Sequence, residues 1–365
     1  MAKKKQSFYR LNRILKTLAQ YYILIGERSN GKSYAVKEEC VKNSYKDKDK
    51  KFILLRRWQV DVKGGLVEQY FSDTPVEIIT DGEYNCLTVY RGCIYFSVID
   101  DDDKVIRGRV AGYVRYLTGE QHYKSGAYKD VMNIIFEEFI SNDNYLPNEV
   151  NKLMSFVSTV ARKESIRVFL IGNSISRVCP YFSEWELIKI PKMVQGQIDV
   201  YEHDTGFIDD DTGEKITVRI AVEFCQSSGA ISKMFFGASS KMTTTGAWQS
   251  DAQPHLEEKL YNYNVLYSLV VQYQSFKFLC QFLKHKKSGA YLWYVQPKST
   301  DIQKGTRIIS DRLIEDNKAT IGFTPLTTAE SELFRYMQNG KIAFSDNLSG
   351  SEFKQAYKML KGVQM

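Results

Sequence analysis

The first half of the chain alternates short apolar runs with stretches of helical periodicity. Several of the runs are continuously apolar, as expected for strands that are buried on both faces of a sheet. Helices are predicted at 32–42 and at 148–162; in the second, apolar side chains recur every three or four residues and Pro147 suits the first turn. The alternation predicts an α/β domain with a mostly parallel sheet. The predicted strands are 21–25, 52–55, 93–98, 131–136 and 168–171.

The pattern changes after Pro191. An Asp-rich turn at 209–214 precedes the alternating strand 216–222, which is typical of a β-hairpin. The stretch 227–246 is rich in Ser, Thr and Gly and has little periodicity, so we expect a linker there, with a domain boundary near residue 235.

The last part of the chain is expected to form an α+β domain. Its predicted elements are a long, aromatic-rich helical segment at 255–285, strands at 290–295 and 306–310, and helices at 328–339 and 350–361. The predicted organisation is therefore a first domain at 1–195, a β-hairpin linker region at 196–235 and a second domain at 236–365.

Composition narrows the class of protein. With 365 residues, 43% of them hydrophobic and 25% charged, the chain is neither a disulfide-stapled mini-protein nor wholly disordered. No apolar run approaches the roughly 18 residues that span a bilayer, and no apolar signal segment follows the basic residues 3–5, so we expect the chain to stay where it is made. The six cysteines show no C-x-x-C spacing and the four histidines no ligand pattern, which favours reduced thiols over a metal site.

Charge is spread unevenly along the chain. Residues 1–60 carry 16 Lys and Arg against 5 Asp and Glu, and residues 231–365 carry 17 against 11, whereas the segment between them is acidic. Two basic regions permit a polyanionic partner. A solvated, lysine-rich surface explains the same charge equally well.

The strongest motif is Gly-Glu-Arg-Ser-Asn-Gly-Lys-Ser at 26–33, a full match to G-x-x-x-x-G-K-[ST]. It follows a predicted strand and precedes a predicted helix, which is the context of a genuine phosphate-binding loop. The glycines let consecutive backbone N–H groups point inward, the lysine would reach the β- and γ-phosphates, and the serine hydroxyl would hold Mg²⁺. The sequence therefore predicts binding of ATP with Mg²⁺. The candidate nucleotide-binding residues are Gly26, Glu27, Arg28, Ser29, Asn30, Gly31, Lys32, Ser33 and Tyr34.

Paired acids follow the strand predicted at 131–136. Glu137 would organise Mg²⁺, together with Ser33, and Glu138 would polarise the attacking water. Glu137 stands where Asp is more usual. A solvated turn is the alternative.

Three further side chains are candidates for the chemistry. Asn173 follows the strand at 168–171 by two residues and would sense the γ-phosphate or orient water, unless it only caps a turn or the following helix. Arg162 closes the helix at 148–162 and would be supplied to the nucleotide of a neighbouring subunit, with Arg167 as a weaker candidate. Basic residues at a helix C-terminus are also favoured by the helix dipole alone.

The motif, the segment Phe-Glu-Glu-Phe-Ile at 136–140, Tyr-Leu-Pro-Asn-Glu at 145–149, Asn-Ser at 173–174 and Pro-Tyr-Phe at 180–182 together resemble the DNA-packaging ATPases of small phi-29-like bacteriophages, which are related to the large terminases. The resemblance covers about residues 8–190. It implies an ASCE-type P-loop ATPase that forms a ring, pentameric in that family, and drives double-stranded DNA into a procapsid through the portal in the infected bacterial host. Whether a structural packaging RNA takes part stays open.

The resemblance also implies roles for single residues. Glu137 matches the Walker B acid, Glu138 the catalytic glutamate and Arg162 the arginine that acts in trans. Lys63, in a turn after the second strand, is the candidate DNA contact, although a turn lysine in water is the more common situation. No nuclease activity is expected from the second domain, which the resemblance likens to an RNase H-type fold without its catalytic acids.

The second domain offers two features that bear on nucleic acid. Its basic and aromatic residues would suit the DNA backbone, or would be lysines snorkelling over a packed strand. They are Lys284, Lys286, Lys287 and Lys298 with Phe282, Tyr291, Trp293 and Tyr294. Its acids do not sit in the paired positions that two-metal hydrolysis requires. They are Asp301, Asp311, Glu315 and Asp316.

The function that these patterns favour is a packaging motor ATPase. The alternative is a nucleotide-gated switch or loading NTPase that is not coupled to DNA translocation. The sequence lacks a convincing N-K-x-D motif for guanine, which counts against a GTPase. A kinase of small molecules is a third possibility.

Overall fold

A computed structural model describes residues 8–119, 123, 128, 130–141, 145–161, 165–208, 212–226, 251–315 and 318–362. These residues form two compact units. The first takes in 8–141, 145–174 and 189–226, and the second takes in 175–188 and 251–362. The expected boundaries at 195 and 235 stay a prediction, and residue 235 lies outside the described residues.

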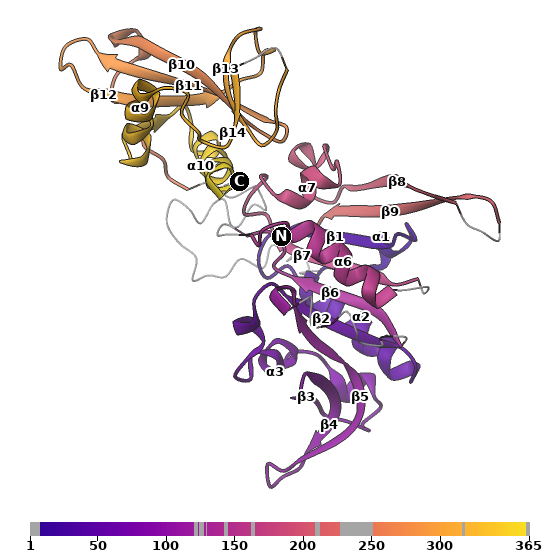
Figure 1. Cartoon of the computed structure of the whole chain (residues 1–365). Coiled ribbons are helices and arrows are strands. Elements are labelled where there is room, and N and C mark those ends of the chain that lie inside the picture. The colour runs from indigo at the N-terminus through magenta and orange to yellow at the C-terminus, as the bar shows by residue number, and fades with distance from the viewer. Residues whose placement is uncertain are drawn as a thin grey trace, which may run out of the picture. The chain divides into compact units, whose positions relative to one another are not determined.

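The first unit is built on a nine-stranded mixed sheet. In chain order its strands are β1 (Tyr21–Gly26), β2 (Lys51–Arg56), β3 (Cys86–Tyr90), β4 (Cys93–Ile99), β5 (Val105–Tyr116), β6 (Val131–Glu137), β7 (Arg167–Asn173), β8 (Ile198–Ile208) and β9 (Lys215–Phe224). Their order in space is β3-β4-β5-β2-β6-β7-β1-β9-β8 (Figure 1). The strands from β5 to β9 in that order run parallel, and the edge pairs are antiparallel. The predicted α/β class with a mostly parallel sheet is therefore confirmed.

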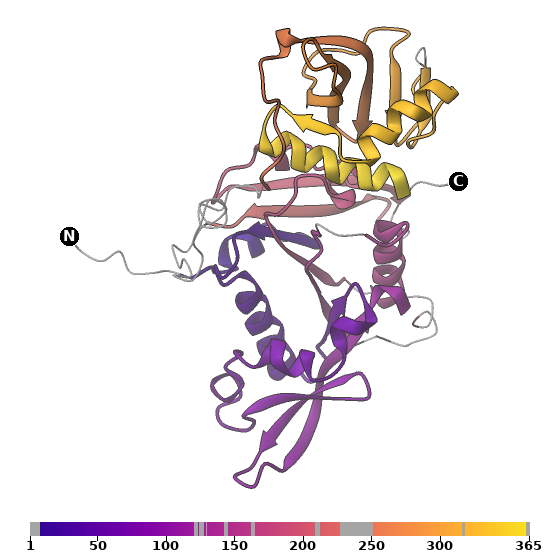
Figure 2. The ribbon, with the colours of Figure 1, turned by 90° about the vertical axis from the view of Figure 1, so that its left-hand side faces the viewer.

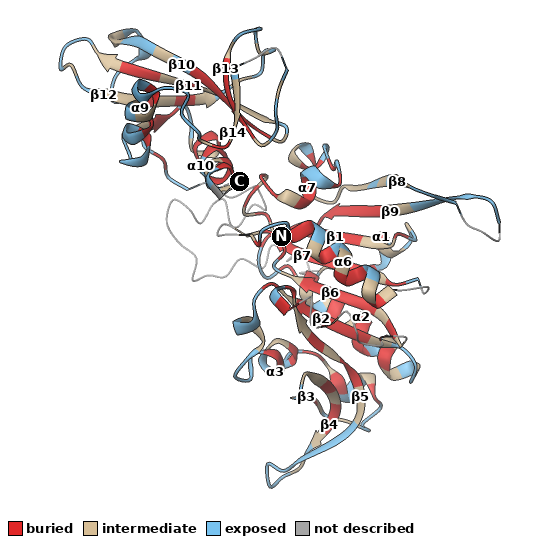
Figure 3. Ribbon diagram, viewed as in Figure 1, coloured by how far each residue is buried: buried red, intermediate tan, exposed pale blue. Residues whose placement is uncertain are grey.

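Burial explains why the central strands could be recognised. β1, β2, β6 and β7 are buried along most of their length, as Figure 3 shows, because they lie in the middle of the sheet and helices cover them. Ile23 pairs with Leu170 and Ile53 with Ile134, so each apolar run packs beside another. The strand predicted at 93–98 also exists, as β4, but it pairs antiparallel with both of its neighbours.

Helices lie on both sides of this sheet. Figure 2 shows α2 (Lys32–Lys46) and α6 (Glu149–Ala161) on opposite faces, where α2 packs on β2 and β6, and α6 packs on β6. Both confirm predicted helices. The shorter elements of the unit are α1 (Asn12–Leu15), α3 (Leu66–Phe71), α4 (Val76–Ile79) and the 3₁₀ turns η1 (Gln59–Val62), η2 (Leu117–Gly119) and η3 (Ile190–Lys192).

The predicted β-hairpin is formed by β8 and β9. Within the described residues it is part of the first unit's sheet, because β9 pairs in parallel with β1 and the last five residues of β9 are buried there. Its far end extends beyond the rest of the unit and is exposed (Figures 1 and 3). The region predicted as a linker between domains thus contributes two strands to the main sheet.

The second unit is an α+β structure, as predicted. Its sheet has the order β14-β13-β10-β11-β12-β15. The strands are β10 (Tyr263–Tyr273), β11 (Phe276–His285), β12 (Tyr291–Pro297), β13 (Arg307–Ser310), β14 (Lys318–Ile321) and β15 (Ile342–Phe344). The helical elements are α7 (Pro180–Glu184), η4 (Leu260–Asn262), α9 (Thr328–Gln338) and α10 (Asn347–Gly362). The strands predicted at 290–295 and 306–310 and both terminal helices are confirmed.

The helical segment predicted at 255–285 is wrong. It is an antiparallel hairpin of β10 and β11, with Val270 opposite Leu279 and a turn at Gln274, whose φ is 56°. Aromatic and β-branched residues favour strands, and successive residues of β11 from Lys277 to Phe282 alternate between half-buried and buried. Trp293, Phe278 and Phe353 pack together in the core against this sheet.

None of the helices in the described part of the chain is long and apolar enough to cross a membrane. All six cysteines are free thiols, in line with the expectation that they do not form disulfides.

Candidate active site

The phosphate-binding loop connects β1 to α2, as the motif predicts. The chain leaves the sheet at Gly26, and Ser29 and Gly31 take left-handed backbone conformations with φ of 61° and 92° before α2 begins at Lys32. A Cβ atom on Gly26 would lie 2.9 Å from Asn30 Nδ2 and 3.2 Å from Cys225 Cβ, so a larger residue does not fit there. The structure therefore explains why glycine stands at both positions of the motif: Gly26 has no room for a side chain, and Gly31 has a left-handed backbone.

Lys32 is buried at the start of α2. Its Nζ donates hydrogen bonds to the backbone oxygen of Glu27, at 2.8 Å, and to Asn173 Oδ1, at 2.9 Å. Burial lowers the pKa of Lys32, and the nearby Glu137 opposes that shift. The structure thus brings together the loop lysine and the polar residue at the end of β7, two residues 141 positions apart in the sequence.

Asn30 adds a second donor to the loop. Its Oδ1 accepts a hydrogen bond from the Lys32 backbone N–H at 3.2 Å. In the part of the chain that the structure describes, its Nδ2 is buried without a partner. A buried ammonium group and a spare N–H donor at a helix N-terminus suit the oxygens of a phosphate chain.

Glu137 ends β6 directly beside the loop. Its Oε1 accepts a hydrogen bond from Ser33 Oγ at 2.7 Å, and its Oε2 accepts one from Tyr70 Oη on α3 at 2.8 Å. Burial raises the pKa of Glu137 while both hydroxyl donors oppose the shift. Burial and the neighbouring carboxylate raise the pKa of Tyr70 well above its usual value, so Tyr70 remains a donor. A carboxylate oxygen and a hydroxyl oxygen at this separation fit Mg²⁺, which prefers such ligands.

Glu138 lies one residue further on, in a turn. Its φ of 57° is unusual for a residue with a side chain, and its carboxylate is exposed. Arg56 Nη2, from the end of β2, donates a hydrogen bond to Glu138 Oε2 at 2.8 Å. The two adjacent acids are thus separated in environment: Glu137 is fixed beside Ser33, and Glu138 faces the solvent.

These residues open onto one cavity of about 970 Å³, at the upper end of the range for small-molecule sites. Arg10, Arg28 and Lys32 line it together with Glu137 and Glu138. Its wall also includes two aromatic residues that precede the first helix; of these, Tyr9 is held by a hydrogen bond from its backbone N–H to Asn30 O and one from its hydroxyl to Glu223. The remaining lining residues are Phe8, Ser29, Asn30, Gly31, Ser33, Tyr34, Glu38, Asp73, Ile171, Gly172 and Asn173.

The other candidate residues do not line this cavity or lie outside the described residues. Glu27 takes part through its backbone oxygen. Lys63 is exposed after η1, and its role as a DNA contact stays a prediction. Arg162 lies outside the described residues. Arg167 begins β7, where it contacts Asn133 and Glu39.

At two aromatic positions of the second unit, the structure agrees with the alternative of a packed strand and not with an aromatic surface for DNA. Phe282 and Trp293 are buried in the core, and Trp293 Nε1 donates a hydrogen bond to the Leu333 backbone oxygen. Rings packed in this way cannot stack on bases. Lys284 lies with its Nζ 5.5 Å from the ring centre of Tyr291, and Lys286 and Lys287 are exposed.

Sequence reasoning missed Tyr70, Arg56 and the neighbouring Arg57. Tyr70 gives no local signal, because it reaches Glu137 only through the fold. The two arginines directly follow the buried run of β2. Since the carboxyl ends of parallel strands meet at one edge of a sheet, that position could have indicated a role beside the acids at the end of β6.

Comparison with known proteins places the chain in a family. A sequence profile described as the Podovirus DNA encapsidation protein (Gp16) matches residues 3–277. The chain belongs to this family. It is 34% identical over 188 residues to the DNA packaging protein of Bacillus phage phi29, and 31% identical over 184 residues to that of Bacillus phage B103. These matches cover 50% and 49% of this chain, and 52% and 51% of the relatives, so the chain spans about half the length of the curated relatives that it matches.

A solved structure supports the fold over a longer range. A chain of the bacteriophage Phi-29 viral genome packaging motor assembly covers 97% of this chain, and 99% of that chain is covered in turn, with a TM-score of 0.54 and 23% sequence identity. The family profile and the relative from phage phi29 confirm the resemblance to phi-29-like packaging proteins. The RNase H-like character of the second unit stays a prediction.

Proposed function

We propose that this protein is the ATPase of a viral genome-packaging motor, which couples ATP hydrolysis to the translocation of double-stranded DNA into a procapsid. One observation supports this above the others: in a member of a DNA encapsidation family, the phosphate-binding loop, two acids and Asn173 meet around one cavity. The protein would act at the procapsid vertex in the infected host.

The residues divide the chemical work between them. Lys32, Asn30 and the loop N–H groups would bind the phosphates, and Ser33 and Glu137 would hold Mg²⁺. When bound, Mg²⁺ would neutralise charge that develops on the phosphate oxygens. Glu138 would take the proton of the attacking water, since it is solvent-facing and adjacent to the metal ligand. Asn173, through its contact with Lys32, would respond to the terminal phosphate.

The proposal is tested with purified protein, ATP and Mg²⁺. The expected result is transfer of the terminal phosphate to water, with ATP preferred over GTP as the substrate. Transfer of phosphate to a small molecule in place of water, or GTP-specific turnover, would refute it in favour of a kinase or a switch.

The hydrogen bond from Tyr70 to Glu137 predicts a change in the Mg²⁺ dependence of ATPase activity when Tyr70 is replaced. We expect Tyr70→Phe to raise the Mg²⁺ concentration for half-maximal ATPase activity by roughly tenfold to a hundredfold, because a hydrogen bond to a charged group is worth about 1.5–3 kcal/mol. Phe has the same shape, so the fold should be retained. A matched control is Tyr336→Phe, an exposed tyrosine of α9. An unchanged Mg²⁺ dependence in Tyr70→Phe would show that Tyr70 does not orient Glu137.

The assembly would be a homo-oligomeric ring, a pentamer if it follows its relatives, docked on the portal and joined by a packaging RNA if its system uses one. Arg162 would then reach the nucleotide of the next subunit. Mixing Arg162→Ala with wild-type protein should lower ATPase activity more steeply than the fraction of variant. A strictly proportional fall would remove the role in trans.

The second unit would contact nucleic acid without cutting it. Among the described residues no group of three or more His, Cys, Asp and Glu side chains is placed to hold a metal, and Asp301, Asp311 and Glu315 are within that described part. Asp316 lies outside the described residues. The candidate contacts to the DNA backbone in this unit are Lys284, Lys286, Lys287 and Lys298. In the first unit the candidate is Lys63.

A further inference from the structure

Arg57 forms a buried ion pair beneath the acidic turn. Arg57 directly follows β2, and its partner Glu149 is the first residue of α6. Both are buried: Arg57 is 5% exposed and Glu149 is 2% exposed. Arg57 Nε donates to Glu149 Oε2 at 2.8 Å and Nη2 donates to Oε1 at 2.9 Å. Two parallel hydrogen bonds of this kind fix both the position and the plane of the guanidinium.

The other donors of the same guanidinium hold the turn that carries Glu138. Nη1 donates to the backbone oxygen of Glu138 at 3.0 Å, and Nη2 donates to that of Phe139 at 2.8 Å. A left-handed conformation at a residue other than glycine persists where its surroundings over-determine it. Glu138, with a φ of 57°, is in such a conformation. The hydrogen bonds from the Arg57 guanidinium to the backbone oxygens of Glu138 and Phe139 hold it there.

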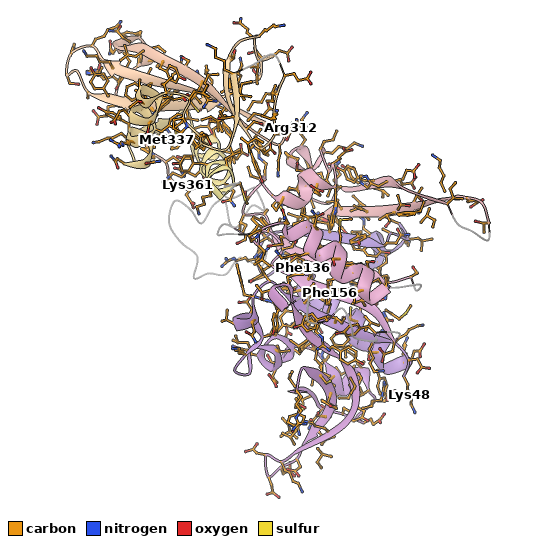
Figure 4. The ribbon with its side chains drawn as sticks, in the orientation of Figure 1. Lys48, Phe136, Phe156, Arg312, Met337 and Lys361 are labelled. Atoms are coloured by element: carbon orange, nitrogen blue, oxygen red, sulfur yellow. The ribbon has the colours of Figure 1, made fainter. Side chains whose placement is uncertain are left out.

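Aromatic rings enclose the guanidinium. Its central carbon lies 5.8 Å from the ring centre of Phe136, on β6, and 5.0 Å from that of Tyr145. Figure 4 labels Phe136 on β6 and Phe156 on α6. The ion pair joins the residue after β2 to the start of α6, and the other Arg57 hydrogen bonds reach the turn that follows β6. In this low-dielectric surrounding the hydrogen bonds are strengthened, and an unpaired charge would be unfavourable.

Glu149 also organises the segment that leads into α6. Besides binding Arg57, its Oε2 accepts a hydrogen bond from the Leu146 backbone N–H at 2.8 Å. α6 continues to Ala161, the residue before Arg162. One ion pair therefore fastens both the turn with Glu138 and the start of the helix that precedes the candidate trans arginine.

We propose that Arg57 is a positioning residue that sets the geometry of Glu138 for hydrolysis, with Glu149 holding Arg57 in place. The inference rests on the proposed function, since it assigns Glu138 the role of the base. Arg57 has no contact with the nucleotide in this account: it acts through the backbone of the turn. Lysine cannot replace it, because a single ammonium group cannot make the four hydrogen bonds in their planar arrangement.

The test compares Arg57→Lys with Arg307→Lys. Arg307 forms a similar buried pair with Glu330 in the second unit, where Nε donates to Oε1 at 2.7 Å, and Glu330 likewise accepts a backbone N–H near the start of a helix. We expect Arg57→Lys to lower kcat for DNA-independent ATP hydrolysis by about tenfold or more, since small misplacements of a catalytic group cost that much. Its Kd for ATP should change less than about threefold by the same reasoning, whereas Arg307→Lys should lower the melting temperature with kcat unchanged.

A double-mutant comparison separates positioning from a general structural role. If Arg57 acts through Glu138, then adding Arg57→Lys to Glu138→Gln lowers the residual turnover no further. Equal fold losses in the wild-type and Glu138→Gln backgrounds, or an unchanged kcat in Arg57→Lys, would overturn the inference. Should Arg57→Lys fail to fold, Glu149→Gln keeps the shape of the partner, and the same loss of kcat with retained ATP binding is expected of it.

The result also distinguishes the two proposals. A Glu138→Gln protein as active as the wild type would contradict the proposed function. Loss of activity in Glu138→Gln together with a fully active Arg57→Lys would contradict the positioning role alone.

Discussion

Glu138→Gln is expected to bind ATP as the wild type does while turnover falls by about a hundredfold to ten-thousandfold, the usual contribution of a general base. The substitution keeps the shape of the side chain but removes its negative charge and its ability to accept a proton. Glutamine keeps an oxygen that can accept the hydrogen bond from Arg56, and the exposed side chain leaves room for the amide. Phosphate release under saturating ATP and a separate measurement of ATP binding would give the two quantities.

Glu77→Gln is the matched control, because Glu77 is an exposed acid of α4 and does not line the cavity. It should retain both binding and turnover. A Glu138→Gln protein with undiminished turnover would show that another group activates the water.

Lys32→Ala is expected to weaken ATP binding by roughly a hundredfold, since charge-assisted hydrogen bonds contribute about 1.5–3 kcal/mol each. The buried ammonium lies between the loop carbonyls and Asn173, where it faces the cavity from the first turn of α2. Burial lowers the pKa of Lys32 because it disfavours the charged ammonium, and an anionic phosphate would be a stronger partner for that charge than the carbonyl and amide oxygens it now contacts. Titration with ATP in Mg²⁺, followed by calorimetry or a fluorescent analogue, measures the change.

Lys42→Ala provides the control on the same helix, since Lys42 is exposed on α2. It should bind ATP with unchanged affinity. Equal affinity of Lys32→Ala and wild type would mean that the loop does not hold the phosphates.

The sequence predicted the parts of the fold that local rules determine. The strands beside the loop are continuous apolar runs, and the loop motif carries its own strand and helix context, so both were recognisable. The hairpin of β10 and β11 was mistaken for a helix because its dense aromatic content hides the alternation between buried and half-buried positions. The pairing of β9 with β1 could not be predicted, because it joins residues about 200 positions apart.

In the site too, residues marked by local patterns were predicted and residues placed only by the fold were not. Lys32, Ser33, Glu137 and Asn173 were predicted from motif and strand ends, and the structure brings them together. Tyr70 and Arg57 were not, because their contacts depend on α3 and α6 packing near the ends of β2 and β6. Residues that position others, through backbone oxygens or a shared carboxylate, leave no spacing pattern in a sequence.

The most direct test of the central claim is the rate of ATP hydrolysis by the purified protein as duplex DNA is added, at low and at high salt. A DNA-translocating ATPase should be stimulated at low salt, and the stimulation should fall steeply as salt rises, because contacts to DNA phosphates release counterions. Hydrolysis at the same rate with and without DNA at low salt, or no hydrolysis at all, would contradict the account.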